Sequence, residues 1–128
     1  MSNRTLKFRA WDKLEKRFFY PDKGYQGHYV LTLNGQFQNL QNGSGGDEYV
    51  VQQWTGLKDS KGVDIYEGDI IRGKFHDTDY NHLKTINAEV VWIERYASFN
   101  IGIEEWRYSG EPVTIIGNIF ENSELLKQ

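Results

Sequence analysis

The sequence of 128 residues contains no cysteine. Disulfide bonds, cysteine-ligated zinc and thiol catalysis are therefore excluded. The absence of cysteine also suits a reducing compartment. A chain of this length buries roughly two-thirds of its extended surface, so a single domain, or a core with a small appendage, needs no covalent or metal cross-link.

Long hydrophobic runs are also missing. The longest apolar stretches span three or four residues, as at Val90–Ile93, whereas a membrane-spanning helix needs about twenty. The basic residues near the start have no apolar run behind them, so they do not predict a secretory signal. We therefore expect a soluble, cytoplasmic protein with no membrane partner.

Proline is scarce, with two residues, while thirteen glycines and an aromatic content of 15% stand out. Aromatic and β-branched residues favour pleated sheets, and glycine permits the tight turns between strands. The composition predicts a mainly β fold.

Alternating and turn patterns divide the chain into two parts. Residues 6–20 predict one antiparallel hairpin. Residues 28–40 predict a second hairpin around Asn34-Gly35, for which we expect a type I′ turn with positive φ at both positions. The glycine-rich segment 42–47 predicts a flexible loop and a boundary. We accordingly expect an N-terminal hairpin unit over residues 1–48 and a second domain over residues 49–128.

The second part predicts five short strands, at residues 49–54, directly after the Gly68-Asp69 turn within 63–72, and at 88–94, 99–106 and 113–120. This number of short strands with turns between them favours a small SH3-like β-barrel. Two turns are expected over residues 55–62 and a polar loop over residues 73–87. A helical turn is expected after Asn122, with Asn122 or Ser123 capping its free amides.

Three segments carry a resemblance to a known family. They are Lys7–Asp12 with the aromatic strand after it, Gln53–Asp59 continuing through Gly62 to Ile65–Ile70, and Ile116–Asn122 followed by Glu124-Leu-Leu126. In order and spacing they resemble the YopX family of phage and prophage proteins. The resemblance implies a phage origin, expression in a bacterial cytoplasm and a mainly β fold. It implies no activity and no catalytic residues.

Two clusters of ionisable residues are candidate chemical sites. His76, Asp77, Asp79 and His82 stand within seven residues and are potential zinc, manganese or iron ligands, although a solvated polar loop is the favoured interpretation. Asp59, Asp64, Glu67 and Asp69 form an acidic group. Gly68-Asp69 is interpreted as a structural turn, in which glycine takes positive φ and the carboxylate accepts nearby amides. Asn118 and Glu121 are interpreted as strand-end and turn residues.

The N-terminal hairpin is the candidate contact surface. Its cations and rings are Lys7, Arg9, Trp11, Lys16, Arg17, Phe18 and Phe19. Interleaved cations and rings are what single-stranded nucleic-acid binding requires. The structural interpretation is that the rings fill a core and the cations form its exposed face. A short hairpin cannot bury all of these rings alone, which favours a contact between copies.

Charge is unevenly distributed. Residues 1–25 carry seven Lys and Arg against three acidic residues, a local charge of +4, while the remainder carries eight against fifteen, a charge of −7. Phosphate-loop, dinucleotide and nucleophile-elbow motifs are absent.

We therefore expect a phage accessory protein that has no enzymatic activity and no cofactor. It would act by protein contacts, as a homo-oligomer or with a phage or host protein. The alternative is a nucleic-acid-binding module using the basic hairpin. A second alternative is a metal-dependent hydrolase using the loop at residues 76–82.

Overall fold

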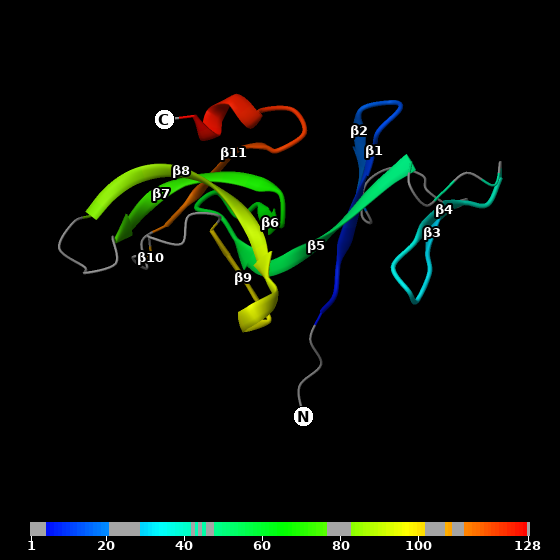
Figure 1. Cartoon of the computed structure of the whole chain (residues 1–128), viewed down its shortest axis with the longest axis horizontal. Helices are drawn as coiled ribbons and strands as arrows, with labels where there is room; N and C mark the ends of the chain where they lie inside the picture. Colours follow the sequence, from blue (N-terminus) through cyan, green and yellow to red (C-terminus); the bar gives the residue numbers. More distant parts are fainter. Residues whose placement is uncertain are drawn as a thin grey trace. The chain divides into compact units, whose positions relative to one another are not determined.

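The computed structural model describes residues 5–20, 29–41, 43, 45, 48–76, 83–101, 107–108 and 112–127. Strands dominate these residues, and their helical structure is limited to short 3₁₀ turns (Figure 1). The mainly β fold predicted by the composition is confirmed. The contact pattern divides the chain into unit 1, residues 1–54, and unit 2, residues 55–128.

Unit 1 contains two antiparallel hairpins, as the sequence predicts. Its strands are β1 (Phe8–Asp12), β2 (Arg17–Phe19), β3 (Tyr29–Leu31), β4 (Phe37–Asn39) and the first part of β5 (Tyr49–Lys58). β1 pairs with β2 on one side and with β5 on the other, and β3 pairs with β4.

The turn between β1 and β2 is built on Asp12. One carboxylate oxygen, Oδ1, accepts the backbone N–H groups of Leu14, at 2.9 Å, and Glu15, at 3.0 Å. Lys16 then takes a left-handed conformation with φ of 56° and donates its N–H to the Asp12 carbonyl at 2.8 Å. The aspartate side chain supplies an acceptor that the turn's own backbone lacks, which is why this short polar segment reverses the chain here.

The hairpin at Asn34-Gly35 is present, but its turn differs from the prediction. Only Gly35 has positive φ, at 86°, so a type I′ turn is wrong. The Thr32 N–H donates to the Gln36 carbonyl and the Gly35 N–H donates to the Thr32 carbonyl, both at 2.9 Å. This bonding defines a three-residue loop with glycine at its left-handed position, which needs positive φ at one residue only.

Unit 2 is formed around a strongly curved antiparallel sheet, which curls into a half-barrel (Figure 1). Its strand order is β10-β7-β8-β9, with β11 also paired to β7. Its strands are β6 (Asp64–Tyr66), β7 (Asp69–His76), β8 (Leu83–Ile93), β9 (Ser98–Ile101), β10 (Arg107–Tyr108) and β11 (Thr114–Asn118). The end of β5, next to β6 in its sheet, also belongs to this unit.

The hydrophobic core of unit 2 lies on one face of this sheet. Its members are Ile65, Ile71, Phe75, Ile86, Ala88, Val90 and Val113. They come from β6, β7, β8 and the residue before β11, so burial of their side chains joins elements that are distant in sequence.

The prediction of a polar loop over residues 73–87 is wrong at both ends of this range, where the structure has strands. β7 continues to His76 and β8 begins at Leu83. Lys74 and Thr85 are exposed cross-strand neighbours, whereas Phe75 and Ile86 are buried. The polar residues that indicated a loop therefore form the solvent-exposed face of a hairpin.

Two further local expectations are wrong. Residues 55–58 continue β5 instead of turning. The last turn, η3 (Ser123–Leu126), has Asn122 at its N-cap position without a side-chain cap. The Asn122 side chain instead accepts the backbone N–H of Asn118 at 3.2 Å.

The division between the units falls between Trp54 and Thr55, inside β5, and not after the glycine-rich segment. β5 pairs with β1 as far as Gln53, which ties its first half to unit 1. Gly45, in the glycine-rich segment, forms a bridge with Gln38 of β4, so this residue is paired within unit 1.

We predict that Gly68→Val will strongly destabilise unit 2. Gly68 is buried and has φ of 85°, and a β-branched side chain at positive φ costs roughly 1–3 kcal/mol. Thr85→Val, on an exposed strand position, should change the free energy of unfolding by about 0.5 kcal/mol or less. Urea denaturation measures both, and equal stabilities for the two variants would refute the turn at Gly68.

Candidate functional site

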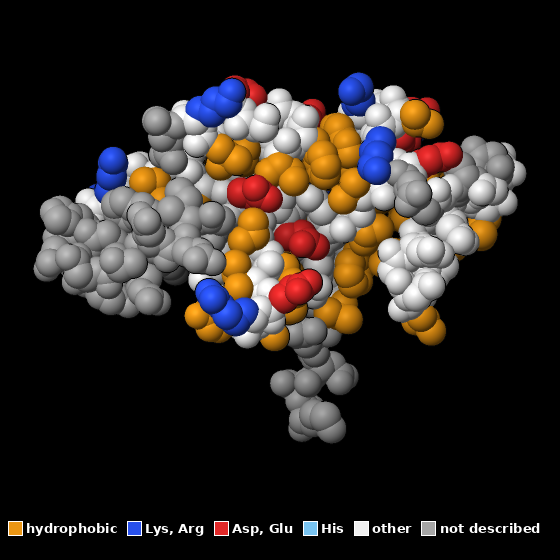
Figure 2. Space-filling model, viewed as in Figure 1, with side chains coloured by type: hydrophobic (Ala, Val, Ile, Leu, Met, Phe, Trp, Pro, Cys, Tyr) orange, Lys and Arg blue, Asp and Glu red, His pale blue; other side chains and the backbone are white. Residues whose placement is uncertain are grey.

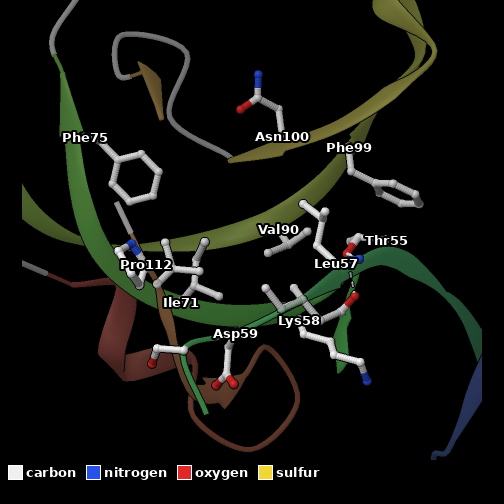
Figure 3. Close-up of a pocket in the computed structure, with 13 residues that line it drawn as sticks. Thr55, Leu57, Lys58, Asp59, Ile71, Phe75, Val90, Phe99, Asn100 and Pro112 are labelled. Atoms are coloured by element: carbon white, nitrogen blue, oxygen red, sulfur yellow. Dashed lines mark hydrogen bonds between the residues drawn. The ribbon is translucent and has the colours of Figure 1, made fainter. Parts of the chain in front are cut away.

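The concave side of unit 2 contains an open cavity of about 510 Å³ (Figure 3). Its floor consists of core side chains: Ile65, Ile71, Phe75, Val90 and Val113, each 7% exposed or less. Leu57, at the end of β5, and Phe99, on β9, form its sides. A pocket of this size lies within the range that binds drug-sized ligands, roughly 300–1,000 Å³.

Most polar side chains around the cavity are already bonded within the chain. The Thr55 hydroxyl donates to the Ile65 carbonyl at 2.7 Å, and the Ser60 hydroxyl bonds that of Thr114 at 2.8 Å. Lys58 forms an ion pair with Asp64 at 2.7 Å. The cavity therefore offers mainly apolar surface to an occupant.

Asp59 is the most strongly held charged group at this cavity. Its Oδ1 accepts the backbone N–H groups of Lys61, at 2.8 Å, and Val63, at 2.9 Å, and its Oδ2 accepts that of Ile115 at 3.1 Å. Burial alone would raise the pKa of Asp59, but these three backbone donors outweigh it and lower the pKa below its usual value. The carboxylate therefore stays ionised, and its hydrogen bonds connect the turn after β5 to β11.

Glu89 is a half-buried acid outside this cavity. Burial raises its pKa above the usual value. Glu89 stands opposite Ile70 in the β7–β8 pairing. In β8 it directly precedes Val90, which lines the cavity. Because successive side chains of a strand point to opposite faces, Glu89 faces away from the cavity.

A close backbone approach shapes one wall of the cavity. A Cβ atom placed on Gly73, in β7, would lie 2.6 Å from Cγ1 of Val113. Real side chains do not tolerate this distance, so the valine packs directly over the glycine backbone.

We predict that Gly73→Ala will destabilise unit 2 by about 1–3 kcal/mol through overpacking. Combining it with Val113→Ala should cost less than the sum of the two single changes, because removing the valine methyl groups relieves the clash. Urea denaturation of the three variants measures the coupling. Strict additivity would contradict this packing.

Two of the segments that carry the family resemblance, Ile65–Ile70 and Ile116–Asn122, meet around the start of β7. The Tyr66 N–H donates to Oδ2 of buried Asp69 at 2.8 Å. The Gly68 N–H donates to the Val90 carbonyl at 2.8 Å, and the Ile119 N–H donates to the Gly68 carbonyl at 2.9 Å. These hydrogen bonds connect strands to turns, so the residues that form them stabilise the fold.

Asn118 and Gly117 organise the turn after β11. The Asn118 side-chain oxygen accepts the N–H groups of Phe120 and Glu121, both at 3.0 Å. A Cβ on Gly117 would lie 2.6 Å from Oδ1 of Asn122. A glycine is therefore required for the Asn122 side chain to reach the Asn118 backbone.

The candidate contact surface of unit 1 is largely engaged within the unit. Arg9 is 4% exposed, donates to Gln52 Oε1 at 2.9 Å and lies over the Phe18 ring at 4.1 Å. Trp11 is 6% exposed and packs edge-on against Phe18 at 4.9 Å. The expectation that the cations form the exposed face is wrong for Arg9, because its guanidinium is stacked and hydrogen-bonded.

The other three cations of the candidate contact surface differ in their exposure to solvent. Lys7 is half-buried and stands over the Trp54 ring at 4.3 Å. Arg17 pairs with Glu15 at 2.8 Å and lies over Phe19 at 4.8 Å. Lys16 and Arg17 are exposed. Among the seven predicted contact residues, only these two cations are exposed.

Phe19 belongs to a four-ring cluster. It packs against Tyr29 at 4.5 Å and Phe37 at 5.8 Å, and Phe37 packs against Tyr49 at 4.9 Å. Burial first, and then the neighbouring Tyr49, raise the pKa of Tyr29. The rings come from both hairpins and β5, so unit 1 buries Tyr49 and partly buries the other three by joining its own strands.

The proposed metal loop lies almost entirely outside the described residues. Of its ionisable residues, only His76 is described, at the end of β7. Elsewhere, the described ranges hold no group of three or more His, Asp or Glu side chains placed to bind a metal.

Sequence reasoning missed the cavity and its rim. The rim includes Leu57, which is 65% exposed. Trp92, 46% exposed, lies next to the lining residue Phe99. Trp92 stands directly opposite Phe99 in the β8–β9 pairing, with ring centroids 5.0 Å apart. The sequence signal for this site is the presence of apolar residues in segments predicted to be turns or strand ends. Polar residues are expected there, because such segments are exposed to solvent.

The surface near the turn between β8 and β9 is mixed in character. Figure 2 shows hydrophobic side chains beside acidic and basic ones over these strands. At this turn, η2 (Glu94–Tyr96), the Arg95 guanidinium lies over the exposed Tyr96 ring at 4.8 Å.

The fold and the cavity define a mainly β protein with an apolar pocket in a curved antiparallel sheet. The sequence matches the family described as YopX protein over residues 7–127, and the chain belongs to this family. No protein with a curated description matches it. No helix in the described part of the chain is long and apolar enough to cross a membrane.

A solved structure also resembles this chain. The crystal structure of protein EF1440 from Enterococcus faecalis is 28% identical in sequence, with a TM-score of 0.59. The match covers 98% of this chain and 100% of that chain.

Proposed function

We propose that this protein is a phage- or prophage-encoded accessory protein that acts in the bacterial cytoplasm by binding proteins and not by catalysis. One observation carries the proposal: the cavity of unit 2 is apolar, and most of its polar side chains are already bonded within the chain. Membership of the YopX family supports the phage origin. The curvature of the unit 2 sheet supports an SH3-like barrel as its architecture.

Self-association is part of the proposal. Residues 1–54 carry seven basic and five acidic residues, a charge of +2, and residues 55–128 carry eight and thirteen, a charge of −5. Surfaces of opposite charge on one chain attract between copies, and salt weakens that attraction. The exposed Lys16 and Arg17 are the strongest candidates for such a contact in unit 1.

Light scattering after size-exclusion chromatography tests self-association. We expect a mass above the 15.0 kDa of one chain at low salt, falling toward that value as salt rises. Lys16→Glu combined with Arg17→Glu should lower the mass at low salt. A strict monomer at every concentration and salt would remove self-association from the proposal.

Nucleic-acid binding receives less support from the contacts of unit 1. Arg9 and Arg17 lie over the rings of Phe18 and Phe19, which are the faces that bases would stack on. Retention on heparin or single-stranded DNA that weakens with salt would favour this alternative instead. Stoichiometric metal in the purified protein would favour the hydrolase.

A further inference from the structure

We propose that the cavity of unit 2, with Leu57 and Phe99 at its rim and Trp92 beside Phe99, binds a partner protein through one large aromatic side chain flanked by Lys or Arg. This inference rests on the proposed function, because it names the site and the partner chemistry of a protein that acts by binding.

The shape of the site favours a single large anchor. The cavity is about 510 Å³ and open on one side, and its floor is made of core residues held by β6, β7 and β8. Residues such as Phe75, which is fully buried, cannot move away without disturbing the core. A preformed pocket with a fixed floor suits a rigid ring, which loses little conformational entropy on binding.

The chemistry of the lining favours an apolar anchor. The hydroxyls of Thr55 and Ser60 and the ammonium of Lys58 are bonded within the chain. Figure 3 shows Ile71 and Val90 lining the cavity, while the Asp59 carboxylate points away from it. A polar anchor would have to displace these internal bonds, whereas a ring would not.

The exposed rim supplies the next part of the contact. Leu57 is 65% exposed and Trp92 is 46% exposed, and Trp92 packs edge-on against Phe99, which lines the cavity. Exposed apolar side chains continuous with a pocket are typical of a binding surface. Tryptophan is also among the residues that most often dominate binding energy at protein interfaces.

The net charge of unit 2 favours basic flanking residues in the partner. Unit 2 has thirteen acidic residues against eight basic ones. A basic segment is attracted to this excess of negative charge, and an acidic segment is repelled. We therefore infer Lys or Arg on either side of the aromatic anchor.

A second copy of this chain is a less suitable occupant. Its segment Lys16–Tyr20 has the right composition. However, Phe18 already packs on Trp11 and Phe19 lies in the four-ring cluster, so neither ring is available as an anchor.

The test measures binding of three fluorescently labelled peptides to the full chain by anisotropy. They are Lys-Arg-Trp-Arg-Lys, the acidic analogue Glu-Glu-Trp-Glu-Glu and the ring-free analogue Lys-Arg-Ser-Arg-Lys. We expect the first to bind at least tenfold more tightly than either analogue. No binding of the first peptide, or equal binding of all three, would overturn the inference.

Two variants locate the peptide. Leu57→Asn removes an exposed apolar rim side chain, and its matched control is Leu14→Asn, since Leu14 is 74% exposed in the β1–β2 turn. We expect at least a fivefold loss of affinity for Leu57→Asn and none for Leu14→Asn. Val90→Phe should abolish binding by filling the cavity, provided that circular dichroism shows a folded protein. Equal affinities of the Leu57 and Leu14 variants would place the peptide elsewhere and overturn the inference.

Light scattering on the same samples separates this inference from the proposed function. If the peptide fails to bind while the chain self-associates, the docking site is wrong and the contact function stands. If Leu57→Asn lowers the mass of the protein without peptide, the rim is an interface between copies, which overturns the choice of a separate partner.

Discussion

Replacing Asp59 with alanine is expected to lower the free energy of unfolding of unit 2 by about 3 kcal/mol or more. The change leaves the backbone N–H groups of Lys61, Val63 and Ile115 without their carboxylate acceptor. Hydrogen bonds to a charged group contribute roughly 1.5–3 kcal/mol each, and they are not fully additive. Urea denaturation followed by tryptophan fluorescence measures the loss.

Two comparisons make this prediction specific. Asp59→Asn should also destabilise, because an amide has one oxygen and would turn its NH₂ group toward at least one of the backbone donors. Asp64→Ala breaks the ion pair with exposed Lys58, for which we expect a loss of about 1 kcal/mol or less. A loss for Asp59→Ala no larger than for Asp64→Ala would contradict the role of Asp59.

The stabilisation by Asp59 should also depend on pH. Its pKa is lowered in the folded state, so the unfolded chain binds the proton more readily. The contribution is therefore fully present above the unfolded pKa of about 3.9 and is lost as pH falls through the lower folded value. The difference in stability between the native protein and Asp59→Asn should be constant near neutral pH and shrink below about pH 4. A difference that grows on acidification would contradict this assignment.

Replacing Phe75 with alanine is expected to have an effect of similar size. Phe75 is 0% exposed and is one of the two largest fully buried side chains in the described residues. Truncating such a phenylalanine costs about 3–5 kcal/mol, from lost burial and from the cavity that remains. Chemical denaturation of unit 2 provides the measurement.

Phe75→Leu is the matched control, since it keeps most of the apolar volume and should lose less than half as much stability. Leu83→Ala, at an exposed position of β8, should lose about 0.5 kcal/mol or less. If Phe75→Ala were as mild as Leu83→Ala, Phe75 would not be a floor residue of the cavity.

The sequence predicted the strands that alternate clearly and have a turn signal at one end. The β1–β2 and β3–β4 hairpins and the β8–β9 hairpin are such cases. The prediction failed where a strand carries polar residues on its solvent-exposed face, as at Lys74 and Thr85. Such a strand has the composition of a loop, and the sequence alone does not show which strand it pairs with. The type I′ turn at Asn34-Gly35 failed because the same dipeptide also fits a three-residue loop.

The cavity could not be predicted for a different reason. Its floor joins Ile65, Val90 and Val113, which are distant in sequence and meet only through the pairing and curvature of the sheet. The burial of Arg9 was likewise hidden, because the sequence does not show that Gln52 of β5 lies opposite it.

The central claim is that the cavity of unit 2 is the binding site of this protein. Nuclear magnetic resonance titration of the ¹⁵N-labelled full chain with Lys-Arg-Trp-Arg-Lys tests it most directly. The account predicts saturable shifts of the backbone amides of Leu57, Ile71, Val90 and Phe99, with those of Leu14 and Phe37 in unit 1 unchanged. Shifts confined to unit 1, or no saturable shift at all, would contradict it.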